Sequence, residues 1–180
     1  MALREIITYP HPILKAKAKP VDVVDDRIKK LVDDMLDTMY DAPGIGLAAP
    51  QVAESLQLCV VDIGVQDDKP GSDVLVLINP RIVKAEGKIV WNEGCLSVPD
   101  FEEEIERKAT ITVQALDRQG KEFQLDAEGL KAVCIQHEMD HLLGTTIADK
   151  VSFVKRNYYL QRVKKGKIAP RDRRDKRVVI

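Results

Sequence analysis

The chain lacks two features that would place it in a membrane or among disulfide-stabilised secreted proteins. No uninterrupted apolar run reaches the about 18 residues that a membrane-spanning helix needs. The three cysteines are an odd number and give no disulfide framework. The first residues also reach charged side chains and His11 too soon to form the apolar core of a secretory leader. We therefore expect a cytoplasmic protein that does not enter a membrane.

Internal repeats and low-complexity tracts are absent as well, and 44% of the 180 residues are hydrophobic. This composition is typical of a folded globular protein, and the length suits one domain. The net charge of −1 hides an uneven distribution, because residues 155–180 hold eleven Lys and Arg but only two acids. We expect residues 1–180 to form a single domain, with residues 166–180 as a basic tail suited to a polyanionic partner.

Short apolar or alternating runs predict several β-strands. They lie at residues 58–63, 74–78, 82–83, 89–91, 109–115 and 123–125. We expect the run at 74–78 to stop at Asn79-Pro80. The runs at 82–83 and 89–91 flank Glu86-Gly87-Lys88, which predicts a hairpin.

Three segments favour α-helix. Apolar residues recur at helical spacing over residues 26–40, which predicts the first helix. A second helix is expected between Asp126 as its N-cap and Gly144 as its left-handed C-terminal cap. A last helix should begin after Ser152 and end near Lys165. Helices and strands that do not alternate indicate an α+β fold.

The second helix carries the sequence Gln136-His137-Glu138-Met139-Asp140-His141, which matches H-E-x-x-H. On a helix His137 and His141 lie one turn apart on the same face, so both rings can reach one cation. Glu138 projects from a neighbouring position, where it can touch a water on that cation without being a ligand. We therefore expect antiparallel sheets packed around a central metal-binding helix, with one helix before them and one after.

Two histidines do not complete a catalytic metal site, which needs three protein ligands and an open position. No histidine follows His141, and Asp149 is the only acid between this motif and the tail. Cys95 is the best upstream candidate, because a thiolate is a strong soft donor. Cys59 and Cys134 lie in apolar runs and resemble buried hydrophobic residues. The alternative, that Cys95 is an idle surface thiol, stays open on this evidence.

Residues 44–49 match the pattern G-x-G-x-x-A. A dinucleotide-binding fingerprint follows a strand and opens a helix. Here a helix precedes the pattern, and Pro50 disfavours helical geometry at Ala49. Gly44 and Gly46 instead indicate a close approach of the backbone to another group, or a tight loop without function.

Three motifs together resemble those of the peptide deformylase family, in the same order, within a similarity over about residues 4–165. They are Gly44-Ile45-Gly46-Leu47-Ala48-Ala49-Pro50-Gln51, Glu93-Gly94-Cys95-Leu96-Ser97 and the H-E-x-x-H segment. The resemblance implies a single catalytic domain that removes the formyl group from the N-terminal formyl-methionine of nascent peptides and releases formate. Cys95, His137 and His141 would hold one divalent metal ion with a water in the fourth position. Most members use Fe²⁺, and the ligand set also permits Zn²⁺, Ni²⁺ or Co²⁺.

The resemblance assigns further roles to individual residues. Glu138 would take a proton from the metal-bound water, which attacks the formyl carbonyl, and later return one to the leaving amine. The Gln51 amide and the Leu96 backbone N–H would stabilise the oxyanion. The substrate-binding residues would be Ile45, Gly46, Glu93, Gly94, Leu130, Val133 and Cys134. Four of these would line a methionine pocket, namely Ile45, Leu130, Val133 and Cys134, although the last three fit a plain helix core equally well.

Glu93 and Asp140 are also candidates to support the metal ligands. In relatives the glutamate at the Glu93 position pairs with an arginine on the next strand, which Arg107 would supply. The sequence pattern around either acid fits a solvated surface group equally well. The acidic run Glu102-Glu103-Glu104 departs from the family, whose members often carry a basic residue near the substrate groove.

The basic tail follows no family pattern, and two readings of it stay open. Relatives use a C-terminal helix to sit near the ribosomal exit, and a basic segment suits ribosomal RNA electrostatically. A solvated helix with a frayed end explains the same charges.

Two other functions compete with deformylation: a metallopeptidase that cuts internal bonds, and a non-catalytic, metal-dependent binding protein. No interaction with DNA is expected.

Overall fold

The structure is a computed structural model that describes residues 2–168 and 179–180. Its strands pair into two antiparallel sheets. The larger sheet has the order β1-β2-β3-β6-β7. Its strands are Gly46–Ala48 (β1), Leu58–Asp62 (β2), Val74–Glu86 (β3), Thr110–Leu116 (β6) and Glu122–Glu128 (β7). The smaller sheet pairs Ile89–Cys95 (β4) with Val98–Arg107 (β5).

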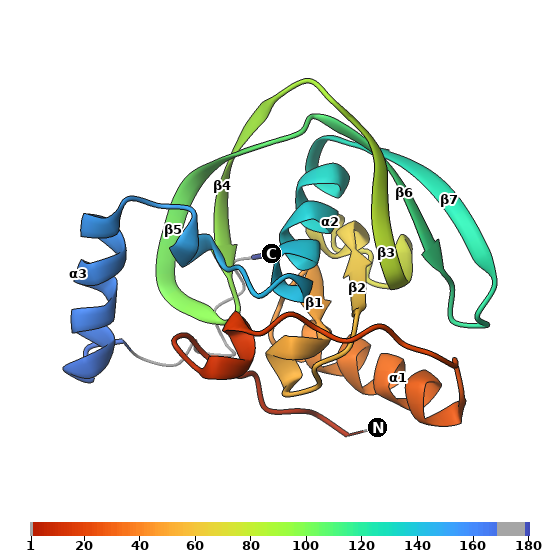
Figure 1. Cartoon of the computed structure of the whole chain (residues 1–180), viewed down its shortest axis with the longest axis horizontal. Coiled ribbons are helices and arrows are strands. Elements are labelled where there is room, and N and C mark those ends of the chain that lie inside the picture. Colours follow the sequence, from red (N-terminus) through yellow and green to blue (C-terminus); the bar gives the residue numbers. More distant parts are fainter. Residues whose placement is uncertain (1, 169–178) are drawn as a thin grey trace.

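The described residues also form three α-helices: Asp26–Asp41 (α1), Gly129–Leu142 (α2) and Phe153–Lys164 (α3). Within the same part of the chain, short 3₁₀ helices lie at Pro12–Lys15 (η1), Ala49–Val52 (η2), Ile63–Asp67 (η3) and Ile147–Asp149 (η4). In Figure 1 α2 lies at the centre, between the larger sheet and the β4–β5 pair. This arrangement confirms the predicted α+β fold around a central helix. Of the described helices, none is long and apolar enough to cross a membrane.

Strand β2 shows why the core forms where it does. All five of its residues are buried, because successive side chains point to opposite faces of the sheet and a helix covers each face. Cys59 and Val61 belong to the apolar cluster that contains the residues of α2. Leu58 and Val60 belong to the cluster that contains α1. The uninterrupted apolar run in the sequence is therefore a strand enclosed on both sides.

The predicted start of α2 was wrong. Asp126 is not its N-cap, because β7 continues to Glu128 and the helix begins at Gly129. Asp126 pairs with Thr112 across the sheet, and its carboxylate accepts a hydrogen bond from Thr112 Oγ1 at 2.6 Å. The predicted C-terminal cap is confirmed, since Gly144 follows the last turn with a φ of 75°.

Strand β3 passes through Asn79-Pro80 instead of stopping there, so this prediction was also wrong. A register shift between Ile78 and Arg81 places both residues in an irregularity of the β3–β6 pairing. A proline can lie in a strand at such a bulge, where its missing N–H breaks no ladder hydrogen bond. The Asn79 side chain secures the irregularity by bonding to both the N–H and the carbonyl of Val21, each at 2.8 Å.

The hairpin predicted around Gly87 does not form. The chain does turn there, and Gly87 has a φ of 65°. The flanking strands then separate, since β3 pairs with β6 and β4 pairs with β5. The turn therefore carries the chain from the larger sheet to the smaller one, on the opposite side of α2 (Figure 1).

Helix α3 begins after Ser152, as predicted, and is anchored to β5. Ser152 Oγ accepts a hydrogen bond from Lys155 N, and the buried Tyr159 donates its hydroxyl to Pro99 O at 2.9 Å. Lys155 also forms an ion pair with Glu103 at 2.7 Å. Glu103, one residue of the acidic run in β5, therefore faces α3.

Candidate metal centre and active site

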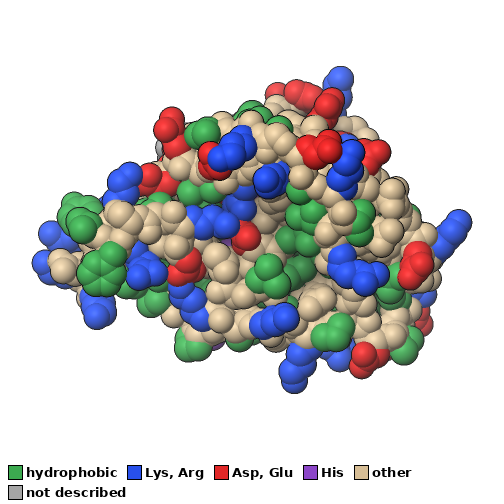
Figure 2. Space-filling view, turned by 45° about the horizontal axis from the view of Figure 1, so that its top comes forward, with side chains coloured by type: hydrophobic (Ala, Val, Ile, Leu, Met, Phe, Trp, Pro, Cys, Tyr) green, Lys and Arg blue, Asp and Glu red, His purple; other side chains and the backbone are tan. Residues whose placement is uncertain are grey.

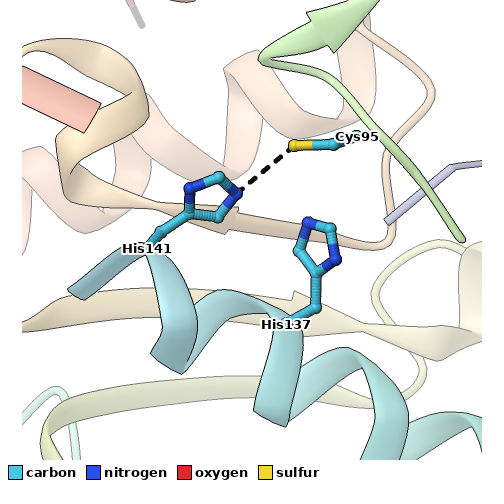
Figure 3. Close-up of side chains that lie close together, drawn as sticks. All are labelled: Cys95, His137 and His141. Atoms are coloured by element: carbon cyan, nitrogen blue, oxygen red, sulfur yellow. Dashed lines mark hydrogen bonds between the residues drawn. The ribbon is translucent and has the colours of Figure 1, made fainter. Parts of the chain in front are cut away.

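Three buried side chains with metal-binding atoms converge between β4 and α2. Cys95 is the last residue of β4, and His137 and His141 lie one turn apart on α2. Their ligand atoms all lie within 4.8 Å of one another. Cys95 Sγ is 3.3 Å from His141 Nε2 (Figure 3). The sequence had predicted both parts of this cluster, the two imidazoles from their helical spacing and the Cys95 sulfur from the lack of a downstream donor.

A second group of residues fixes the orientation of the His137 ring. Its Nδ1 lies 2.8 Å from Glu93 Oε2 and donates to that carboxylate. Arg107 binds the same carboxylate through two hydrogen bonds, at 2.7 and 2.8 Å. Arg107 also contacts Asp140 on α2. Because Nδ1 is engaged with Glu93, Nε2 of His137 carries the free lone pair on the side of Cys95.

The charge state of Glu93 follows from these contacts. Burial favours the neutral acid, but the hydrogen bonds from Arg107 and His137 outweigh it and lower the pKa of Glu93. Glu93 is therefore an ionised carboxylate in the core, paired with a guanidinium whose side chain is only 4% exposed. The expected Glu93–Arg107 contact is present. Asp140, whose side chain is 20% exposed, also pairs with Arg107, so neither acid is simply a solvated surface group.

The donor set fits a divalent cation. Among the described residues, His137 Nε2 is buried without a hydrogen-bonding partner, an arrangement that is costly unless another group satisfies it. Burial lowers the pKa of His141, which keeps its ring neutral as a metal ligand must be. Burial and the charge of Glu138 raise the pKa of Cys95. A cation beside the sulfur would offset both effects and favour the thiolate.

Glu138 lies beside this cluster and is fully buried. In the part of the chain that the structure describes, neither of its carboxylate oxygens has a hydrogen-bonding partner. Burial raises the pKa of Glu138 well above its ordinary value, although Arg107 opposes this shift. An unengaged carboxyl group of raised pKa next to metal ligands is suited to proton transfer.

Gly46 is pressed against Glu138. A Cβ atom at Gly46 would lie 2.3 Å from Glu138 Oε1 and 2.9 Å from Cys134 Sγ. The first glycine of the pattern is also confined, because a Cβ at Gly44 would lie 2.8 Å from Leu96 Cδ1. The close backbone approach that these glycines predicted is therefore present, and it is made towards the candidate active site.

We expect Gly46→Ala to lower the rate of the catalysed reaction by at least about tenfold, because the new methyl group must displace the Glu138 carboxylate. The measurement is kcat, together with the melting temperature to confirm folding. Gly166→Ala is the control for a methyl group added away from the site, since its Cβ would meet nothing within 4 Å. The φ of 63° at Gly166 strains an alanine there, so this control should lose some melting temperature but keep its kcat. Equal kcat values for both variants would show that Glu138 need not hold its observed position.

The remaining predicted site residues surround this centre. Gln51, in η2, is fully buried; its Oε1 accepts from Ala48 N at 2.7 Å, and its Nε2 points at Cys95 Sγ from 3.8 Å. Leu96 directly follows Cys95 and is buried in the cluster that contains α1. Gly94 precedes Cys95 and packs against Val179.

The four residues assigned to a methionine pocket share one apolar cluster. Ile45, Val133 and Cys134 are buried members, and Leu130 packs against them while partly exposed. Cys134 Sγ also donates to Ile45 O at 3.5 Å. Sequence reasoning did not identify Ile180, which belongs to the same cluster, or Val179, which packs against the neighbouring cluster that contains Leu96. No pattern could have revealed them, because the three apolar residues 178–180 that follow the charged segment are too few to show a periodicity.

Fold and site together define a class: single-domain α+β enzymes with an H-E-x-x-H helix and a cysteine donor from an upstream strand. The chain belongs to the polypeptide deformylase family, whose sequence model matches residues 3–157. It is 48% identical over 165 residues to the peptide deformylase of Syntrophobacter fumaroxidans, covering 92% of this chain and 96% of that one. It is 52% identical over 166 residues to that of Teredinibacter turnerae, covering 92% and 94%.

Solved structures of relatives agree with this assignment. The crystal structure of a peptide deformylase from Legionella pneumophila matches with a TM-score of 0.85 and 43% identity, covering 92% of this chain and 96% of that one. A peptide deformylase from Ehrlichia chaffeensis in complex with actinonin matches with a TM-score of 0.86 and 38% identity, covering 93% and 99%.

Proposed function

We propose that this enzyme removes the formyl group from the N-terminal formyl-methionine of nascent peptides and releases formate, using one divalent metal ion. The observation that carries the proposal is the buried, unengaged Glu138 carboxyl beside the Cys95, His137 and His141 donors. Membership of the polypeptide deformylase family indicates the substrate class, which is peptides with an N-terminal formyl-methionine. A closed structural metal site would want four protein donors and would give Glu138 no task.

Each protein group has a definite task in this reaction. When bound, the metal ion would lower the pKa of water and polarise the formyl carbonyl. Glu138 takes the proton from the attacking water and later delivers one to the leaving amine. The Gln51 amide, which points towards Cys95, and the Leu96 backbone N–H donate to the oxyanion that forms. Loss of one such donor typically costs about 2.7–4 kcal/mol of barrier.

The methionine side chain is assigned to the apolar cluster beside the metal donors. Ile45, Leu130, Val133 and Cys134 contribute apolar surface to it. Gly46 and Gly94 offer backbone without side chains to the substrate chain. Glu93 takes part through its backbone, because its carboxylate is occupied by Arg107 and His137.

The test is formate release from formyl-Met-Ala-Ser by anaerobically purified protein of measured metal content. We expect Fe²⁺ to be the native ion, with Zn²⁺, Ni²⁺ or Co²⁺ able to replace it. Blocked casein-like peptides, which carry no formyl group, should not be cleaved. Cleavage of those peptides without formate release would identify a metallopeptidase instead.

We also propose that the basic C-terminal segment brings the enzyme to the ribosome. Phe153, Val154 and Tyr158 on α3 are exposed. Figure 2 shows hydrophobic side chains beside Lys and Arg side chains at the left end of the molecule. The other basic residues of the predicted tail, from Arg171 to Arg177, lie outside the described residues. Deleting the residues after Gly166 should weaken ribosome pelleting in low salt, and unchanged, salt-independent pelleting would exclude this docking.

A further inference from the structure

Strand β1 forms one edge of the larger sheet, and Val179 pairs with the chain at that edge. Gly44 and Val179 form a parallel β-bridge. Ile45 N donates to Val179 O at 2.9 Å, and Val179 N donates to Pro43 O at 3.4 Å. An extended segment added to a free strand edge is a common way for a protein to bind a peptide.

The side chain of Val179 closes the gap to the smaller sheet. A Cβ atom at Gly94, in β4, would lie 3.0 Å from Val179 Cγ1. Val179 also packs against the apolar cluster that contains Leu96. It therefore lies between the two backbone segments, around Gly46 and Gly94, that were assigned to the peptide substrate.

Ile180 follows Val179 and lies in the apolar region beside the metal donors. It is only 3% exposed and belongs to the same cluster as Ile45, Val133 and Cys134. These are residues assigned to the methionine side chain of the substrate. Isoleucine is aliphatic and of similar size to methionine, so both would make the same kind of contact.

We propose that Val179–Ile180 occupies the peptide groove of the free enzyme, and that a formyl-methionyl peptide must displace it in order to bind. This inference rests on the proposed function, because it takes the groove to be the substrate site. Val179–Ile180 pairs with one strand edge and packs into one apolar cluster. A short apolar peptide is expected to bind through the same two features. An enzyme whose groove is open only one time in ten binds its substrate about tenfold more weakly.

The test compares the full chain with the variant Ile180→Asp, whose carboxylate would be costly to bury in the apolar cluster. We expect KM for formyl-Met-Ala-Ser to fall about tenfold with kcat unchanged. Val179→Gly should act in the same direction, and it introduces no charge. Val23→Asp is the matched control, because Val23 is 70% exposed and the substitution should leave KM unchanged.

A binding measurement separates this inference from the proposed function. Trp91 is the only tryptophan in the chain, and it packs against the cluster that contains Ile180. Its fluorescence should change in Ile180→Asp, and the peptide Met-Ala-Ser should then bind more tightly. Melting temperatures show whether each variant is folded.

Three outcomes are decisive. Equal KM values and equal peptide affinities in the full chain and both groove variants would overturn the inference and leave deformylation standing. Tighter peptide binding by the variants without formate release from any protein would refute the function and keep the groove assignment. A lower KM in the Val23→Asp control as well would mean that added charge, and not release of the groove, causes the effect, which would also overturn the inference.

Discussion

Replacing Glu138 by glutamine is expected to lower kcat for formate release about 10²- to 10⁴-fold. Glutamine has the size and shape of the buried glutamate, but it cannot accept a proton and return it. The substitution should leave the donor atoms of Cys95, His137 and His141 in place, so the metal content should be retained. Steady-state kinetics with formyl-Met-Ala-Ser will show whether the loss falls on kcat, as expected for a group that acts in the transition state.

Glu106→Gln makes the same chemical change at a surface position of β5. Glu106 pairs with Lys88 at 2.9 Å, and its side chain is 57% exposed. Exposed ion pairs contribute about 0–1 kcal/mol, so neither kcat nor stability should change noticeably. If Glu138→Gln kept its metal and matched Glu106→Gln in kcat, the proton would have to be carried by another group.

The metal donors were predictable from the sequence because their geometry is largely local. Two histidines four residues apart must share a helix face, and this placed His137 and His141 together before any tertiary structure was known. Cys95 followed from the chemistry of an incomplete site, because no suitable donor lies downstream. The environment of Glu138 was not predictable in the same way, since the packing of Gly46 against it depends on contacts between distant segments.

The errors in the fold arose where pairing between distant segments decides the structure. The apolar runs on either side of Gly87 have the pattern of a hairpin, but β6 and β5 are their actual partners. Asn79-Pro80 looked like the end of a strand because the bulge that admits a proline depends on Val21, which is far away in sequence. Asp126 was predicted as a helix cap because local sequence rules do not detect its pairing with Thr112 on the neighbouring strand.

Removing the guanidinium of Arg107 is expected to damage both stability and metal binding. In Arg107→Leu the buried Glu93 carboxylate loses its cationic partner, and breaking a buried pair in this way costs about 3–5 kcal/mol of unfolding free energy. Glu93 would then no longer hold Nδ1 of His137 in a fixed place, and loss of such support typically weakens metal affinity about 10- to 100-fold. Urea unfolding and Co²⁺ titration of metal-free protein measure the two effects.

Arg118→Leu is the matched control, because Arg118 also pairs with an acid but does so on the surface. Its contact with Asp33 is 2.6 Å, and the two side chains are 38% and 49% exposed. Water screens this pair, so its loss should cost no more than about 1 kcal/mol and should not change metal affinity. If Arg107→Leu lost stability but bound Co²⁺ as tightly as Arg118→Leu, Glu93 would serve only to neutralise a buried charge. Weaker Co²⁺ binding by Arg107→Leu alone would instead establish that the chain from Arg107 through Glu93 to His137 positions the metal ligand.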